Sequence, residues 1–196
     1  VGGLMGFTIT RVGLPWELNM FVLLLPALAL AWMVSRATFP VTERVAAGVS
    51  YGQMFSELLK RPLFWVFWVC MFFTATAELA PGQWVNIALS HIVGMQGILL
   101  LVYVSALMFV MRHFAGPIVA HISPIGLMFV SCLAAGIGLY LLSLADTPAL
   151  AFGAATVWGI GVCYLWPTML AITSERFPRG GAMALGLMGF AGGMAI

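Results

Sequence analysis

The segment MFFTATAELAPGQWVNIALS, residues 71–90, places one carboxylate, Glu78, in the middle of a long apolar run. A charge at the centre of a bilayer costs about 3 kcal/mol or more, so an ionisable residue there indicates a functional site unless a partner explains it. Pro81 and Gly82 follow shortly afterwards, and a proline removes a backbone donor from a helix. An interrupted helix with polar groups at mid-depth is typical of a solute site in a membrane. The segment therefore predicts such a site beside Glu78.

The composition of the whole chain indicates a membrane protein. Of its 196 residues 63% are hydrophobic and only 7% are charged, and the mean hydropathy is +1.09. A soluble domain of this composition could not cover its surface with polar groups. The predicted fold class is therefore all-α, a polytopic bundle of membrane helices in contact with the lipid bilayer. The net charge of +2 is small and scattered, so nucleic acid is not expected as a partner.

The apolar runs predict membrane helices joined by short loops. Residues 1–10 have the composition of the end of one helix, and residues 18–34 form a first complete span. Residues 36–61 break the apolar pattern, and Ser50 and Gln53 within them have the spacing of a capping box. We expect a short amphipathic helix on the membrane surface there, with a solvated loop as the alternative. Further spans are predicted over residues 62–90, 95–119, 124–145 and 148–174, and from residue 181 onward.

The positions of the basic residues predict the orientation of these spans. All but one of the eight Lys and Arg residues follow the first, third and fifth complete spans, and only Arg11 lies on the other side. The side that is richer in Lys and Arg is expected to be cytoplasmic. With this topology Glu78 lies within about 3 Å of the midplane and Tyr164 within about 5 Å, at 1.5 Å per residue. Glu78 and Tyr164, which belong to two separate predicted spans, can therefore meet at a similar depth.

Polar and aromatic side chains near that depth are candidate contacts for a solute. An aromatic surface beside a few hydrogen-bonding groups suits sugars and similar polar molecules. Pro167 interrupts the span 148–174 beside Trp166. For Trp158 and Trp166 the alternative is that their rings only pack helices together. The predicted binding residues are Glu78, Gln83, Trp84, Asn86, Tyr164 and Trp158.

Other chemistry-bearing residues show no familiar pattern. The sequences Gly-Ile-Gly at 136–138 and 159–161 lack the third glycine of a dinucleotide fingerprint and a preceding strand. The three histidines lack metal-ligand spacing, and the three cysteines are scattered. No metal or cofactor is therefore expected, and the chain is not predicted to be an enzyme. Near the end of the chain, small residues that would let membrane helices pack closely recur at Ala182, Gly186, Gly189 and Gly193.

Several stretches resemble the major facilitator superfamily, whose members are twelve-helix secondary transporters made of two six-helix halves. The loop 36–61 lies where that family has its central cytoplasmic loop. MRHFAGPIVAHISP, residues 111–124, resembles the loop between helices eight and nine, although Ala120 and His121 stand where the family motif has Asp and Arg. SERFPRGGA, residues 174–182, resembles the junction before helix eleven. More narrowly, TATAELAPGQWV around Glu78 looks like helix seven of the fucose-permease-like sugar transporters.

The resemblance implies that the chain is a fragment, from the end of helix five to the start of helix eleven. Residues 1–35 would end the N-terminal bundle, residues 36–61 would form the cytoplasmic central loop, and residues 62–196 would form most of the C-terminal bundle. Its partner would be the N-terminal half of the same transporter. The whole would be a multi-pass protein of the plasma (inner) membrane.

The function that the resemblance implies is that of a permease for a small polar solute, such as a sugar or a related metabolite. It would work by alternating access, with protons as a candidate coupling ion. Glu78 would bind the solute or carry the proton. A cytoplasmic gate would be formed by Arg112, Glu175, Arg176 and Arg179. Two alternatives stay open: a transporter-derived sensor or scaffold without flux, and a membrane-embedded enzyme whose reactive groups come from helices outside this chain.

Overall fold

A computed structural model describes residues 2–15, 17–39, 41, 45, 48–92 and 96–195. Within these ranges the regular secondary structure is entirely helical, which confirms the predicted all-α class. The chain divides into two compact units, Val1–Thr42 and Glu43–Ile196. The first unit contains α1 (Gly2–Val12) and α2 (Leu18–Arg36). The turn between them starts at Gly13, which has a positive φ of 73°.

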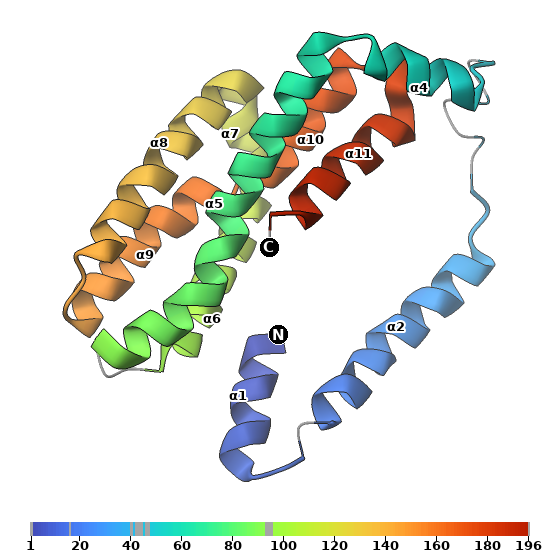
Figure 1. The fold of residues 1–196 in the computed structure, drawn as a ribbon. Coiled ribbons are helices and arrows are strands. Elements are labelled where there is room, and N and C mark those ends of the chain that lie inside the picture. The colour runs from blue at the N-terminus through green and yellow to red at the C-terminus, as the bar shows by residue number, and fades with distance from the viewer. Residues whose placement is uncertain are drawn as a thin grey trace. The chain divides into compact units, whose positions relative to one another are not determined.

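The second unit is a bundle of helices that carries every residue discussed below (Figure 1). Three of its helical segments, Pro62–Val85, Pro124–Ser143 and Pro148–Arg176, are long and apolar enough to cross a membrane. In the first unit Met20–Arg36 is a shorter apolar helix, as is Gly97–His113 in the second. The elements of the second unit are α4 (Tyr51–Leu59), α5 (Pro62–Ile92), α6 (Gly97–His113), α7 (Ala115–His121), α8 (Pro124–Ser143), α9 (Pro148–Val162), α10 (Leu165–Arg176), the 3₁₀ turn η1 (Pro178–Gly180) and α11 (Gly181–Gly193).

The helix α4 begins where the capping box predicted it. The Ser50 hydroxyl accepts a hydrogen bond from the Gln53 amide, and the Gln53 side-chain oxygen accepts one from the Ser50 amide at 2.9 Å. Met54 and Leu58 are buried, and α4 contacts α5, α11 and η1. The amphipathic helix is therefore formed, and one of its faces packs against α5, α11 and η1 of the same unit.

The helices α8 and α9 pack side by side at very short distance (Figure 1). A Cβ atom added at Gly138 would lie 2.2 Å from the backbone nitrogen of Trp158, and one added at Gly161 would lie 2.2 Å from that of Ala135. Only a residue without a Cβ atom allows two backbones to approach so closely. Gly136, by contrast, faces open space. One glycine of each Gly-Ile-Gly sequence therefore serves the packing of α8 against α9.

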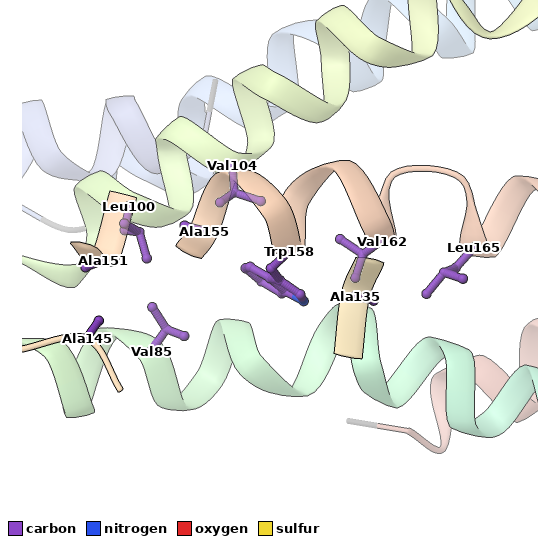
Figure 2. Packing of buried hydrophobic residues seen from close by; sticks show 10 residues of the cluster. All are labelled: Val85, Leu100, Val104, Ala135, Ala145, Ala151, Ala155, Trp158, Val162 and Leu165. Carbon is purple, nitrogen blue, oxygen red and sulfur yellow. The ribbon is translucent and has the colours of Figure 1, made fainter. Parts of the chain in front are cut away.

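Trp158 of α9 lies in the largest apolar cluster, which joins five helices. Figure 2 shows its ring among Val85 of α5, Val104 of α6 and Ala135 of α8. The indole N–H donates a hydrogen bond of 3.1 Å to the carbonyl of Ala77 in α5. This carbonyl lies four residues before Pro81, which has no N–H to offer it. Trp158 therefore supplies the donor that the proline removes.

The predicted stripe of small residues lies on the open face of α11. Nothing lies within 4 Å of a Cβ atom added at Gly186, Gly189 or Gly193, and Ala182 is exposed. No described helix packs against the stripe, so its role in close helix packing stays a prediction. The buried face of α11 instead carries Ala184, Met188, Ala191 and Gly192.

The first prediction follows from the close approach of α8 and α9. Gly138→Ala and Gly161→Ala should each lower the thermal stability of the detergent-purified protein, because overpacking of this kind costs about 1–3 kcal/mol. Gly136→Ala is the matched control and should leave the melting temperature unchanged or slightly raised. Equal melting temperatures for all three variants would contradict the packing described here.

The second prediction follows from the hydrogen bond between the Trp158 indole and the carbonyl of Ala77. Trp158→Phe should destabilise the protein, since an unsatisfied buried carbonyl costs about 1–3 kcal/mol on top of the lost packing. In a Pro81→Ala background the loss should be smaller by about 1 kcal/mol or more, because alanine restores the backbone donor. Denaturant unfolding of the four proteins measures this coupling.

Trp65 is the control for that cycle, because its indole N–H donates to the carbonyl of Leu59, which is not affected by Pro81. Trp65→Phe should have the same effect with and without Pro81. If the cost of Trp158→Phe were also independent of Pro81, the proposed replacement of the missing donor would be refuted.

Candidate functional site

Glu78 forms an ion pair with Arg112. A terminal nitrogen of Arg112 donates to Oε1 of Glu78 at 3.2 Å. The Glu78 side chain is only 10% exposed, whereas that of Arg112 is 44% exposed. The sequence analysis expected Arg112 in a cytoplasmic gate, and it did not find a partner for Glu78 within this chain. The structure supplies that partner from α6.

The end of α6 explains why Arg112 reaches Glu78. Glu78 lies near the middle of α5, whereas Arg112 is the last residue but one of α6. Pro117 in α7 has no N–H to bond the carbonyl of His113, and α6 ends at that residue. The predicted span 95–119 is therefore two helices, and Arg112 lies beside the junction between them.

The guanidinium of Arg112 also binds the junction between α9 and α10. Its Nε donates to the carbonyl of Cys163 at 3.0 Å. This carbonyl lies four residues before Pro167, so the helix cannot provide its usual donor. The segment between the two helices consists of Cys163 and Tyr164, where the sequence analysis expected an interruption near Pro167. Arg112 thus holds both a carboxylate and a carbonyl that a proline has freed.

The carboxylate of Glu78 faces the N-terminal turn of α10. The backbone amide of Trp166 interacts with it, and amides in the first turn of a helix lack partners within the helix. The partial positive charge at a helix N-terminus favours an anion there. The second oxygen, Oε2, is nevertheless buried without a hydrogen bond to any residue that the structure describes. One acceptor of Glu78 therefore remains available for a donor.

A cavity of about 410 Å³ opens beside this pair. Its volume lies within the range of small-molecule sites. Arg112 has five N–H groups, of which two make the bonds above, so further donors remain. The site thus offers several donors and an aromatic wall, beside a carboxylate whose buried Oε2 lacks a donor among the described residues. The lining residues are Glu78, Leu79, Arg112, Trp166 and Pro167.

Two of the predicted binding residues lie inside the protein core. Tyr164 is 5% exposed, and its hydroxyl donates to the carbonyl of Met111 at 2.7 Å. Trp158 is 2% exposed, and its N–H is bonded to Ala77. Neither lines the cavity beside Glu78. The structure therefore places both residues where they join helices.

The remaining predicted contacts on α5 lie elsewhere. Trp84 is 71% exposed and lines a separate, largely apolar cavity of about 600 Å³ between α5 and the end of α8. Gln83 is also exposed. The side chain of Asn86 lies outside the part of the chain that the structure describes. Of the predicted binding residues whose side chains the structure describes, only Glu78 lines the cavity described above.

The predicted gate residues are divided between two places. Glu175, Arg176 and Arg179 line a cavity of about 300 Å³, together with the ion pair between Arg61 and Glu57. Arg112 lines the cavity of Glu78 instead.

Three residues of the site were not among the predicted binding residues. Cys163 contributes only a backbone carbonyl, Trp166 contributes a ring and an amide, and Pro167 lines the wall. Pro167 was the signal in the sequence that could have identified them. The carbonyl of the residue four positions before a proline must find another donor. Within the described residues, no group of three or more His, Cys, Asp or Glu side chains could hold a metal ion.

Comparison with known proteins agrees with this architecture. The family model for the Major Facilitator Superfamily matches residues 1–196, which is the whole chain. No curated protein and no solved structure matches it significantly. The match and the apolar spanning helices make it an integral, multi-pass membrane protein. The chain belongs to the Major Facilitator Superfamily of membrane transporters.

Proposed function

We propose that this chain carries the solute site of a secondary transporter, and that the site is the cavity beside Glu78 and Arg112. The observation that supports the proposal most directly is the incomplete pairing of these two residues. Oε2 of Glu78 lacks a donor within the described residues, and the guanidinium of Arg112 is 44% exposed. A polar solute in the cavity would bond the exposed guanidinium, and Oε2 would accept from the solute once the Glu78 carboxylate turns toward the cavity.

The solute class that suits these groups is a neutral sugar or a related polyol. A hydroxyl group can donate to Oε2 of Glu78 while a neighbouring hydroxyl accepts from Arg112. The apolar face of a sugar ring would lie against Trp166, which lines the same cavity. This assignment agrees with the resemblance of the segment around Glu78 to the fucose-permease-like branch.

Transport would proceed by alternating access. The N-terminal half of the same transporter would close the other side of the cavity, and the two halves would rock about it in the plasma membrane. Arg176 and Arg179 would belong to the cytoplasmic gate with Glu175. In this account the site binds solute at mid-depth and the charged cavity at the end of α10 controls access to it.

Protons are the proposed coupling ion, and Glu78 is their proposed carrier. A proton on Oε2 would give the buried oxygen a hydrogen to donate, and it would remove the charge that holds Arg112. The guanidinium would then be free to turn toward the solute or toward the carbonyl of Cys163 alone. Proton binding and solute binding would thus share one ion pair.

The third prediction tests the solute class. The complete transporter in proteoliposomes should take up a neutral monosaccharide saturably, and other hexoses or polyols should compete with it. Monocarboxylates should not compete, because Glu78 lies beside the guanidinium and repels a second carboxylate. Uptake of organic anions only would overturn the assignment. Binding of a sugar without any flux would favour a transporter-derived sensor.

The fourth prediction tests Glu78 itself. Glu78→Gln keeps the shape of the side chain and removes its titration, so proton-driven accumulation should fall at least tenfold while solute counterflow persists. Glu17→Gln is the matched control, because Glu17 is an exposed carboxylate of the first unit. It should leave proton-driven accumulation unchanged. Accumulation that survives unchanged in Glu78→Gln would remove Glu78 from the coupling mechanism.

A further inference from the structure

Trp166 contacts α11 as well as the cavity. A Cβ atom added at Gly192 would lie 2.2 Å from Cη2, 2.3 Å from Cζ3 and 3.3 Å from Cζ2 of the Trp166 ring. The edge of the indole therefore packs directly against the Cα atom of Gly192, which carries no side chain. Trp166 also lines the cavity with Glu78 and Arg112. One side chain thus connects a glycine of α11 to the site.

This contact is specific to one position of α11. A Cβ atom added at Gly186, Gly189 or Gly193 would meet nothing within 4 Å. At Gly192 the ring would have to retreat by roughly 1.4 Å before its carbon atoms reached the ordinary contact distance of about 3.5–4.0 Å. Any side chain at Gly192 would therefore displace the indole.

The cavity is the free space into which the ring can move. Trp166 packs against the apolar cluster that includes Met188 and Ala191 of α11, and it borders the cavity beside Glu78. The helix α11 itself lies beside α5 and α10 (Figure 1). It is tied to α5 by a hydrogen bond of 3.1 Å from the Trp68 indole to the carbonyl of Leu187. A ring that is pushed from α11 therefore shifts toward Glu78 and Arg112.

We propose that Gly192 is a positioning residue of the solute site, which sets the place of the Trp166 ring and thereby the size of solute that the cavity accepts. The proposal rests on the proposed solute site and extends it to α11, whose residues do not line the cavity. Gly192 does not touch the solute in this account. It acts through the indole, because the absence of a Cβ atom keeps the ring out of the cavity.

The first experiment needs no solute. In a complete transporter whose native cysteines are replaced by serine, Leu79→Cys places a thiol in the wall of the cavity. Gly192→Ala should slow its labelling by a small methanethiosulfonate reagent at least threefold, because the displaced ring narrows the cavity. Gly193→Ala, which faces open space, should leave the labelling rate unchanged. Trp166→Phe should restore the rate in the Gly192→Ala protein, since the smaller ring no longer reaches the added methyl group.

The second experiment measures uptake of a monosaccharide. Gly192→Ala should raise KM at least fivefold and leave the maximal rate within twofold, with a larger effect on a disaccharide than on a monosaccharide. The Gly192→Ala and Trp166→Phe changes should be non-additive in KM. If Gly192→Ala alone fails to fold, the double variant should fold and be labelled, because the clash is relieved.

The outcomes separate the two proposals. Equal labelling of the Gly192→Ala and Gly193→Ala proteins, or no recovery with Trp166→Phe, would overturn the role of Gly192 and leave the proposed solute site untouched. Slower labelling with an unchanged KM would show that Trp166 bounds a cavity that the solute does not use. That result would overturn both proposals together.

Discussion

The second unit depends on how backbone carbonyls are satisfied after prolines interrupt its helices. In a bilayer no water is present to bond a free carbonyl, so another group of the protein must donate to it. Trp158 of α9 does so for Ala77 of α5, and Arg112 of α6 does so for Cys163. Each donor comes from a different helix than its acceptor. The interruptions therefore become points where helices are joined by directional bonds and not only by apolar packing.

The same constraint brings two charged residues together near the middle of α5. Arg112 approaches the α9–α10 junction because a free carbonyl is there, and from that position its guanidinium also reaches Glu78. A buried carboxylate is costly unless it is paired and hydrogen-bonded. Here the pairing is partial, since Oε1 is bonded and Oε2 has no partner among the described residues. A site that is held in place but not fully satisfied is suited to exchanging partners.

The two ion pairs of the described residues differ in surroundings and hence in expected role. Arg61 and Glu57 are separated by one helical turn at the exposed end of α4, where solvent screens their attraction. Glu78 and Arg112 belong to different helices, and the Glu78 side chain has little contact with solvent whereas that of Arg112 is partly exposed. Breaking a buried pair by removing one partner leaves an uncompensated charge. The inner pair therefore links the arrangement of α5, α6 and α10 to the charge state of one carboxylate.

The sequence by itself determined the class of protein and several local features. Its apolar composition requires membrane helices, the capping box at Ser50 starts α4, and an isolated carboxylate in an apolar run marks Glu78 as the centre of a site. These features depend on residues that are close together in the chain. Local geometry and transfer free energy are sufficient to predict them.

Only the tertiary structure decided which side chains meet Glu78. Arg112 and Trp166 reach it from other helices, whereas Tyr164 and Trp158 use their polar atoms on backbone carbonyls and lie in the core. A one-residue change in helix phase turns a side chain by about 100°, so similar depth does not imply a shared face. That phase is set by packing between distant segments, such as the close approach at Gly138 and Gly161. Sequence spacing within one helix does not contain this information.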